Sequence, residues 1–322
     1  MKIRALDLFS GIGGFHLGFS RAGYEVTSYF SEVDKHAIAV YQHQFKNSTY
    51  VGAVGDVRGA DLPAIDLITF GSPCQDFSQA GARRGLEGDR SSLIAEAIRL
   101  IRECRPRVFI WENVKGTFSS NDGADFAAIL QAFIDLGGYR LEWQLLNTSW
   151  FLPQNRERIY LVGYSTTTKR NWRGVFPIRE ANQSNSELEC AGKAVTKCLT
   201  ARGQEGHAGM QLVKVKQIGT KLDSNGGTQP YQQDRVYDAD GLVPALNQGK
   251  SDLIIKNNYR IRRLTPIECE RLQGFPDNHT AFGIYDDQKK PMSNTQRYKQ
   301  CGNAVTVDVV QAVAEQCKPL FK

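Results

Sequence analysis

Cys74 is the residue of this 322-residue chain with the clearest chemical potential. It directly follows Pro73, and an apolar run from Ile65 to Phe70 precedes both. Such a run, bounded by Gly71 and Pro73, predicts a buried strand that ends in a loop. Proline restricts the backbone there, and glycine allows a turn or the close approach of a ligand. Cys74 is therefore a candidate nucleophile, and the alternative is a structural cysteine buried in the core.

A carboxylate and two guanidinium groups are expected near this thiol. Glu112 follows residues 107–111, which read as a strand, and ligands bind at the carboxyl ends of strands in open α/β sheets. Arg156 and Arg158 alternate before the strand expected at 159–164, so they share one face. A free thiol has a pKa of about 8.5, and nearby cations favour its thiolate. We therefore expect Glu112 to share a crevice with Cys74, and the alternative is a carboxylate at an exposed strand end.

A second set of residues predicts a pocket for an adenosine ligand. Residues 3–9 read as a strand that runs into Ser10-Gly11-Ile12-Gly13-Gly14 and then into a helix. Backbone N–H groups at such a turn can bind a pyrophosphate or an amino-acid carboxylate. Glu32, at the end of the second strand, is placed to bind a ribose, and Asp56, after Gly55, adds another carboxylate to the same pocket. The alternative is a tight strand-to-helix connection without a ligand.

Alternating strands and helices predict an α/β fold with a doubly wound, mostly parallel sheet. Thr265, Pro266 and Glu268 predict the start of a later helix, as N-cap, first and third residues, and Gly274 its end. The last helix, 307–317, has an apolar face that the first domain must cover. Further elements are expected as helices at 92–103 and 126–136 and strands at 26–30, 139–146 and 159–164.

Composition divides the chain. Residues 1–150 carry 15 Lys and Arg against 17 Asp and Glu, whereas 151–322 carry 25 against 17. The segment 166–258 is polar and glycine-rich with short β-like pieces, which indicates a separate small domain or a partly disordered insertion. A basic surface suits a polyanion such as nucleic acid. The glycine- and arginine-rich residues 76–90 read as a cationic loop that closes over such a partner.

Other classes of protein are disfavoured. No apolar run approaches the ~20 residues of a membrane span, and an acid at position 7 is too early for a signal peptide, so we expect a cytoplasmic protein without membrane contact. The seven cysteines include no C-x-x-C pair. Neither a disulfide framework nor a metal site is therefore expected.

Taken together, these motifs resemble those of the C5-cytosine DNA methyltransferases over most of the chain outside about 166–258. The family's cofactor turn is matched by residues 7–14, its Pro-Cys by Pro73-Cys74, and its Glu-Asn-Val by Glu112-Asn113-Val114. Its Gln-x-Arg-x-Arg is matched at 154–158, its Arg-x-x-Thr-x-x-Glu helix at 262–275 and its Gly-Asn-Ala-Val at 302–305. The resemblance implies a Rossmann-like S-adenosyl-L-methionine (AdoMet) fold, with S-adenosyl-L-homocysteine as a product and without a metal.

The resemblance also implies a division of the chain and a set of site residues. The catalytic domain is expected at 1–165, a β-rich target-recognition domain at 166–258, and a bridging helix with a C-terminal segment that returns to the catalytic domain at 259–322. The expected partner is duplex DNA, bound by a monomer that is paired in function with a restriction endonuclease. The implied catalytic residues are Cys74, Glu112, Arg156 and Arg158; the cofactor residues are Phe9, Ser10, Gly11, Ile12, Gly13, Gly14, Glu32, Val33, Asp56, Val57, Pro73, Asn303 and Val305; and the DNA contacts are Gln75, Ser78, Arg83 and Arg84.

The chemistry of cytosine explains why these residue types are needed. C5 is a poor nucleophile, and attack of the Cys74 thiolate at C6 breaks the aromaticity and makes C5 enamine-like. Glu112 would protonate or hydrogen-bond N3 and offset the charge pushed into the ring. After methyl transfer from AdoMet, loss of the C5 proton expels Cys74. The base must be flipped out of the duplex, with the loop 76–90 closing behind it.

Three alternatives remain open at this point. A tRNA cytosine-C5 methyltransferase would share the chemistry, but that branch typically has a different tripeptide near the cysteine and a smaller insert. An inactive DNA-binding relative would explain the basic half without requiring Cys74 and Glu112. An NAD-dependent oxidoreductase would explain the glycine turn and Glu32 but gives no role to Cys74.

Overall fold

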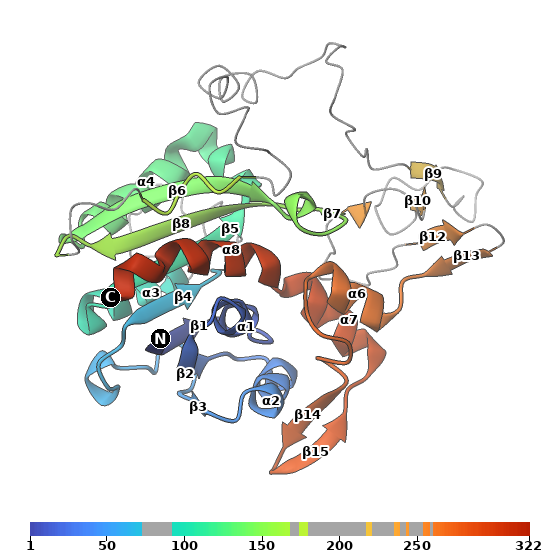
Figure 1. The fold of residues 1–322 in the computed structure, drawn as a ribbon, viewed down its shortest axis with the longest axis horizontal. Coiled ribbons are helices and arrows are strands. Elements are labelled where there is room, and N and C mark those ends of the chain that lie inside the picture. The colour runs from blue at the N-terminus through green and yellow to red at the C-terminus, as the bar shows by residue number, and fades with distance from the viewer. Residues whose placement is uncertain are drawn as a thin grey trace.

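The computed structural model describes residues 1–72, 92–167, 174–179, 217–220, 235–238, 243–244, 254–257 and 260–322. Its centre is a seven-stranded sheet of order β3-β2-β1-β4-β5-β8-β6, in which β8 alone runs antiparallel to its neighbours (Figure 1). The strands are β1 Lys2–Leu8, β2 Glu25–Ser31, β3 Ser48–Tyr50, β4 Leu67–Phe70, β5 Val108–Val114, β6 Tyr139–Asn147 and β8 Glu157–Ser165. The doubly wound, mostly parallel α/β fold predicted from the sequence is thereby confirmed.

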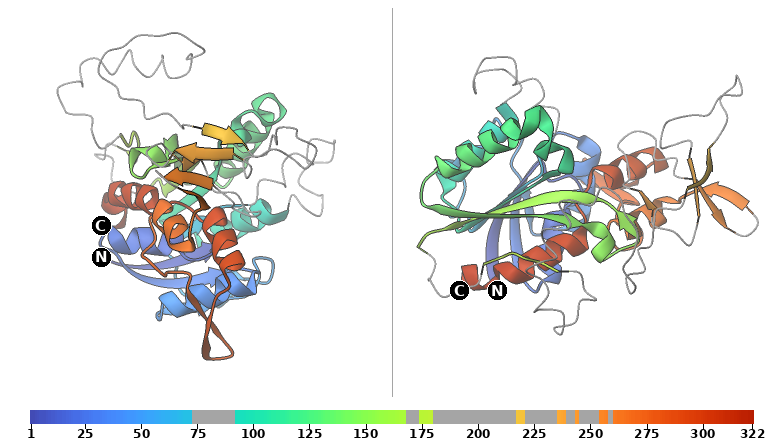
Figure 2. Two further views of the ribbon diagram at one scale, coloured as in Figure 1. Left: turned by 90° about the vertical axis from the view of Figure 1, so that its right-hand side faces the viewer. Right: turned by 90° about the horizontal axis from the view of Figure 1, so that it is seen from above.

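Side chains of these strands alternate between two cores because successive residues of a strand point to opposite faces. From β1, Ala5 enters a core with α1 (Gly14–Arg21) and α8 (Val307–Cys317), and Leu6 enters a core with α3 (Ser92–Cys104) and α4 (Ala124–Ile134). The right-hand view of Figure 2 shows α4 and α8 on opposite sides of the sheet. The central strands β4, β5 and β8 are therefore buried on both faces, as their near-continuous apolar runs predict.

The predicted return of the last helix to the first domain is confirmed. α8 packs so closely on α1 that a Cβ atom added at Gly18 would lie 2.4 Å from Val310 Cγ1. Beyond α8, the ring of Phe321, in the short η8 helix (Lys318–Phe321), meets Tyr24 edge to face. The two termini consequently lie side by side (Figures 1 and 2).

The helix α6 (Pro266–Leu272) begins as predicted. The Thr265 side chain accepts from the Glu268 amide while the Glu268 side chain accepts from the Thr265 amide, which completes a capping box. The helices α2 (Lys35–Gln44) and α7 (Asn294–Asn303) and the protruding hairpin of β14 (Phe282–Tyr285) and β15 (Gln288–Pro291) were not predicted. The buried residues of α7 are Gln300, Cys301 and Gly302, so this helix has no apolar stripe to reveal it.

A small sheet of order β13-β12-β10-β9 lies at one end of the molecule, beside α6 and α7 (Figures 1 and 2). Its strands are β9 Gln217–Thr220, β10 Arg235–Asp238, β12 Ile254–Asn257 and β13 Arg260–Arg263, and the short β11 Val243–Pro244 pairs with β7 Gln154–Asn155 of the larger region. Residues 174–179, by contrast, attach to β6, because Glu142 and Gln144 hydrogen-bond their backbone. The domain boundaries expected after residues 165 and 258 stay predictions.

Candidate active site

A cavity of about 800 Å³ lies at the carboxyl ends of β1, β2, β4 and β5. This is the edge at which open α/β sheets bind ligands, and the volume suits a nucleoside-sized molecule. Its walls come from eight separate stretches of the chain. The lining residues are Phe9, Gly11, Ile12, Ser31, Glu32, Val33, Asp34, Ala37, Ala53, Val54, Gly55, Gly71, Ser72, Leu93, Glu112, Asn113, Val114, Arg156, Arg158, Lys299, Gln300, Gly302 and Asn303.

Glu32 holds the glycine turn at one side of this cavity. Its Oε2 accepts from the Gly11 amide at 2.9 Å, and its Oε1 accepts from the amides of Val33 and Asp34. Gly11 has a φ of +54° with no atom within 4 Å of a built Cβ, and Phe9 also has a positive φ of 52°. A left-handed aromatic residue is strained, which is typical of binding sites. The predicted residues Phe9, Gly11, Ile12 and Glu32 are thus brought together in the lining.

Six of the other predicted cofactor residues that the structure describes do not line the cavity, and four of these, Ser10, Gly13, Gly14 and Val305, lie in or behind the glycine turn. A Cβ at Gly13 would lie 2.2 Å from the Phe45 ring, and one at Gly14 would lie 2.5 Å from Val305 Cγ2. These two glycines are therefore required by packing, and Val305 lies behind the turn. The Oγ atom of Ser10 is buried without a hydrogen-bond partner among the described residues. Direct contacts of these four residues with a cofactor stay predictions.

The second strand end and the following loop form another wall. Val33 lines the cavity and is 78% exposed, so it offers an open apolar surface. Val54 and Gly55 line the cavity too, but the side chain of Val57 is buried in the core with α3, and the exposed Asp56 lies next to the lining rather than in it. The turn exposes Gly55 and Asp56 and buries the side chains of Val54 and Val57, so the predicted cofactor contact of Val57 has no support in the lining.

Glu112 and Arg158 form an ion pair on the opposite side of the cavity. Arg158 Nε lies 3.2 Å from Glu112 Oε1, although its N–H does not point along a hydrogen bond, and Oε1 has no hydrogen-bond partner among the described residues. The Glu112 side chain is only 10% exposed. A Cβ at Gly71 would lie 3.0 Å from Glu112 Oε2, so glycine makes room for the carboxylate. The two carboxylate oxygens of Glu112 can therefore form hydrogen bonds with a ligand in the cavity.

Arg156 is buried at the cavity wall and supports the chain around Asn303. Its Nη2 donates to the Ala304 carbonyl at 3.0 Å and its Nη1 to the Gly302 carbonyl at 3.5 Å. Arg156 and Arg158 both line the cavity, although Arg156 lies between β7 and β8 rather than within a strand. Their described partners differ, because Arg156 holds backbone carbonyls whereas Arg158 faces a carboxylate.

Ser72 anchors the chain at the cavity, two residues before Cys74 in the sequence. Trp111 Nε1 donates to Ser72 Oγ at 3.1 Å, and Asn113 Nδ2 lies 3.4 Å from both Ser72 oxygens. The predicted loop 76–90 lies outside the described residues, and so do the predicted site residues Pro73, Cys74, Gln75, Ser78, Arg83 and Arg84.

Sequence reasoning missed several lining residues, among them Asp34, Lys299 and Gln300. Lys299 Nζ donates to Asp34 Oδ2 at 2.7 Å and joins α7 to the start of α2. Burial alone would raise the pKa of Asp34, but hydrogen bonds from Lys299 and the His36 amide hold it below its ordinary value. Gln300 is 4% exposed, and neither atom of its amide has a hydrogen-bond partner among the described residues. An N-cap pattern could have revealed Asp34, whereas no local signal marks Gln300.

The donor set of this cavity fits AdoMet. The carboxylate of Glu32 and the exposed Val33 suit an adenosine, and the free amide of Gln300 offers both a donor and an acceptor to a charged amino-acid group. Within the described ranges, no three His, Cys, Asp or Glu side chains are grouped so that they could hold a metal ion. None of the described helices is long and apolar enough to cross a membrane.

Comparison with known sequences gives consistent matches along the chain. The family model described as C-5 cytosine-specific DNA methylase matches residues 3–319. The type II methyltransferase M.NlaX of Neisseria lactamica is 34% identical over 319 residues, covering 98% of this chain and 96% of that protein. M.HhaI of Haemophilus parahaemolyticus is 30% identical over 325 residues, covering 97% of this chain and 93% of that protein.

Solved structures share the fold at lower identity. The Dnmt2 methyltransferase of S. pombe superposes with a TM-score of 0.65 at 18% identity, with full coverage of both chains. A putative DNA modification methyltransferase encoded within an E. coli prophage gives a TM-score of 0.60 at 21% identity and 99% coverage of each chain. At these identities the similarity establishes a common architecture.

Proposed function

This chain belongs to the C-5 cytosine-specific DNA methylases, and on that premise we propose that it methylates a flipped-out cytosine at C5 through a covalent bond to Cys74. It is a DNA cytosine-5-methyltransferase of the restriction–modification type that uses AdoMet. One observation carries the proposal. A single cavity joins the glycine turn and Glu32 to Glu112, Arg158 and the chain that leads into Cys74.

The cofactor would occupy the side of the cavity near the first two strands. Glu32 would receive the ribose hydroxyls, because its carboxylate is held in place by three backbone amides. Gly11 leaves the backbone open to a ligand, and Asn303 and Gln300 contribute amides from α7. When bound, AdoMet supplies an electrophilic methyl group.

The cytosine would occupy the side near Glu112 and Arg158. Glu112, in protonated form, would donate to N3 and so stabilise the ring as the Cys74 thiolate bonds to C6. Arg158 lies next to Glu112 and adds positive charge on the same side. Once C5 carries the methyl group, removal of its proton returns electrons to the ring and breaks the bond to Cys74. The target atoms are unreachable within a duplex, so this arrangement requires base flipping.

The remaining assignments are part of the same proposal. Residues 166–258 would read the target sequence, because this segment is basic, polar and outside the shared motifs, and its strands β9, β10 and β12 belong to the small sheet beside α6 and α7. Duplex DNA is the proposed substrate in preference to tRNA, since the relatives named above are type II methyltransferases. Action as a monomer and pairing with a restriction endonuclease stay predictions.

Trapping with 5-fluorocytosine tests the covalent step. Fluorine at C5 cannot leave as a cation, so methylated target DNA should remain bonded to Cys74 and survive denaturing electrophoresis. The adduct should require AdoMet and should be absent in Cys74→Ser, whose hydroxyl is far less acidic. Cys104→Ser is the matched control, because burial raises the pKa of the Cys104 thiol to about 11 and this residue is remote from the cavity lining.

Two results would contradict the proposal. If the wild-type protein methylates ordinary cytosine but never yields the adduct, the mechanism is wrong. If Cys74→Ser still gives the adduct, another residue is the nucleophile. Labelled methyl transfer to duplex DNA, with tRNA as the competing substrate, tests the substrate class in the same experiment.

A further inference from the structure

Arg99, in the middle of α3, binds the loop that forms one wall of the cavity without lining the cavity itself. Its Nη2 donates to the carbonyls of Val57 at 2.9 Å and Val54 at 3.3 Å. Its Nε donates to Glu96 Oε2 and its Nη1 to Glu103 Oε1, each at 2.8 Å. All three nitrogens of the guanidinium are thus used, with three hydrogen bonds inside the helix and two to a loop more than forty residues away in sequence.

Glu103 makes a second connection between the same helix and the same loop. Its Oε1 accepts from Arg99, and its Oε2 accepts from the Gly59 amide at 2.7 Å. A Cβ at Gly59 would lie 2.7 Å from Glu103 Cβ, so the backbone of the loop lies directly on the helix. Residues 99 and 103 are one turn apart on α3 and therefore act on one stretch of the loop.

The loop held in this way has two sides. The side chains of Val54 and Val57 are 6% and 4% exposed, and both pack in the core with α3. The opposite side, at Val54 and Gly55, is cavity wall. The two carbonyls that Arg99 binds flank Gly55 and Asp56, so its contacts determine how far this turn extends toward the cavity.

We propose that Arg99 is a positioning residue for the cofactor: its bonds to the carbonyls of Val54 and Val57 hold the loop 53–57 as the adenosine-facing wall. This inference rests on the proposed function, because it takes AdoMet as the ligand of the cavity. Arg99 touches neither the cofactor nor the cytosine in this arrangement. Its effect should therefore appear in AdoMet affinity and not in the chemical step.

The test uses Arg99→Gln and Arg99→Lys in the full-length protein. Glutamine removes both the charge and the planar set of guanidinium donors. Lysine keeps the charge but cannot direct parallel donors to two carbonyls and two carboxylates. Arg102→Gln is the matched control, since Arg102 is exposed on the same helix. We expect the AdoMet Kd to rise roughly tenfold in both Arg99 variants, from the loss of charged hydrogen bonds, and to stay unchanged in Arg102→Gln.

Further measurements separate positioning from general structural damage. The kcat at saturating AdoMet and the KM for DNA should stay within about twofold of the wild type, because the hydrogen bonds of Arg99 reach neither Glu112 nor Arg158. Glu103→Gln, which keeps its shape, should raise the AdoMet Kd by a smaller factor and is informative even if Arg99→Gln is unstable. Wild-type affinity in Arg99→Lys and Arg99→Gln, or an equal loss of kcat and AdoMet affinity, would overturn the inference. Failure of the wild type to bind AdoMet would instead overturn the proposed function, and the inference with it.

Discussion

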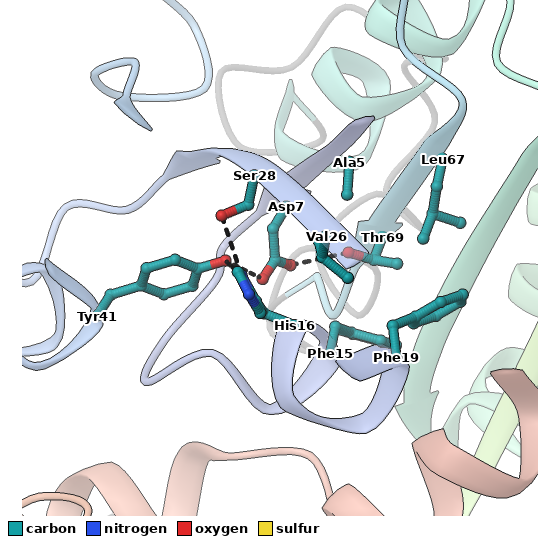
Figure 3. Close-up of a pocket in the computed structure, with 10 residues that line it drawn as sticks. All are labelled: Ala5, Asp7, Phe15, His16, Phe19, Val26, Ser28, Tyr41, Leu67 and Thr69. Atoms are coloured by element: carbon teal, nitrogen blue, oxygen red, sulfur yellow. Dashed lines mark hydrogen bonds between the residues drawn. The ribbon is translucent and has the colours of Figure 1, made fainter. Parts of the chain in front are cut away.

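Two polar pockets lie along the same strands and differ in how their polar atoms are satisfied. The smaller, of about 10 Å³, is enclosed among β1, β2, β4, α1 and α2. Figure 3 shows its polar side chains pointing toward one another. Thr69 Oγ1 and Tyr41 OH donate to the two oxygens of Asp7 at 2.9 and 3.2 Å, and His16 Nδ1 lies 3.0 Å from Ser28 Oγ. No buried polar atom of these five side chains lacks a partner.

The larger cavity, of about 800 Å³, has the opposite character. Glu112 Oε1 and both amide atoms of Gln300 are buried there without hydrogen-bond partners among the described residues. Burial of such atoms is costly unless a ligand or water supplies the missing bonds. The small pocket, whose buried polar atoms all have partners and which has almost no free volume, stabilises the fold, whereas the large one keeps its capacity for a substrate. Substitutions in the two should therefore affect different quantities.

The largest effect is expected for Glu112→Gln in the large cavity. The substitution keeps the shape of the side chain but removes the proton that would be given to cytosine N3. The rate of methyl transfer at saturating AdoMet should fall by roughly 10²- to 10⁴-fold, the range of a lost general acid, while AdoMet affinity is retained. Single-turnover kinetics measure this, with Glu25→Gln of the exposed Lys2–Glu25 pair as a control. A rate within threefold of the wild type would remove Glu112 from the chemistry.

Asp7→Asn in the small pocket should change stability and its pH dependence. Burial raises the pKa of Asp7 from 3.8 to about 7, against the opposing hydrogen bonds from Thr69 and Tyr41. Between these values the unfolded chain loses the Asp7 proton and the folded protein keeps it, so the free energy of unfolding falls as pH rises. The loss is complete above about pH 7 and is on the order of 4 kcal/mol. Asparagine cannot ionise and avoids this loss.

Urea unfolding of the wild type and Asp7→Asn at several pH values checks this expectation. The free energy of unfolding of the variant should increase relative to that of the wild type as pH rises from about 4 to 8. The affinity for AdoMet should stay unchanged. His16 acts in the opposite sense, because burial lowers its pKa to about 4 and costs stability as pH falls below 6.5. Since both proteins contain His16, its contribution cancels in the difference. A stability difference that is independent of pH would show that Asp7 is ionised throughout.

The smallest effect is expected for Gln300→Leu in the large cavity. The direction of its effect on stability distinguishes the large cavity from the small pocket. Leucine removes a buried amide that has no described partner, so the free energy of unfolding should stay the same or rise. AdoMet binding should weaken by roughly five- to tenfold, as for one or two lost hydrogen bonds. Calorimetry and urea unfolding measure the two quantities. Reduced stability with unchanged AdoMet affinity would show that Gln300 stabilises the fold, as the residues of the small pocket do, and does not bind the cofactor.

Local patterns predicted much of the fold because the interactions they report are local or periodic. The apolar runs of β1, β4 and β5 predicted buried strands, and the residues Thr265 and Glu268 predicted the start of α6. The strand period placed Arg156 and Arg158 together, and both line the cavity. The helix α7 escaped prediction because its buried side is polar.

The amino-acid sequence by itself determined the order of the elements, the strand ends that carry Glu32 and Glu112, and the family to which the chain belongs. Only the tertiary structure decided how the three glycines of the first turn divide their roles: Gly11 opens to the cavity, whereas Gly13 and Gly14 admit Phe45 and Val305. It also decided that Lys299 would meet Asp34 and that Arg99 would hold the loop 53–57. These contacts join residues far apart in the chain, and no local spacing encodes which distant atoms the packing of helices on a sheet brings within bonding distance.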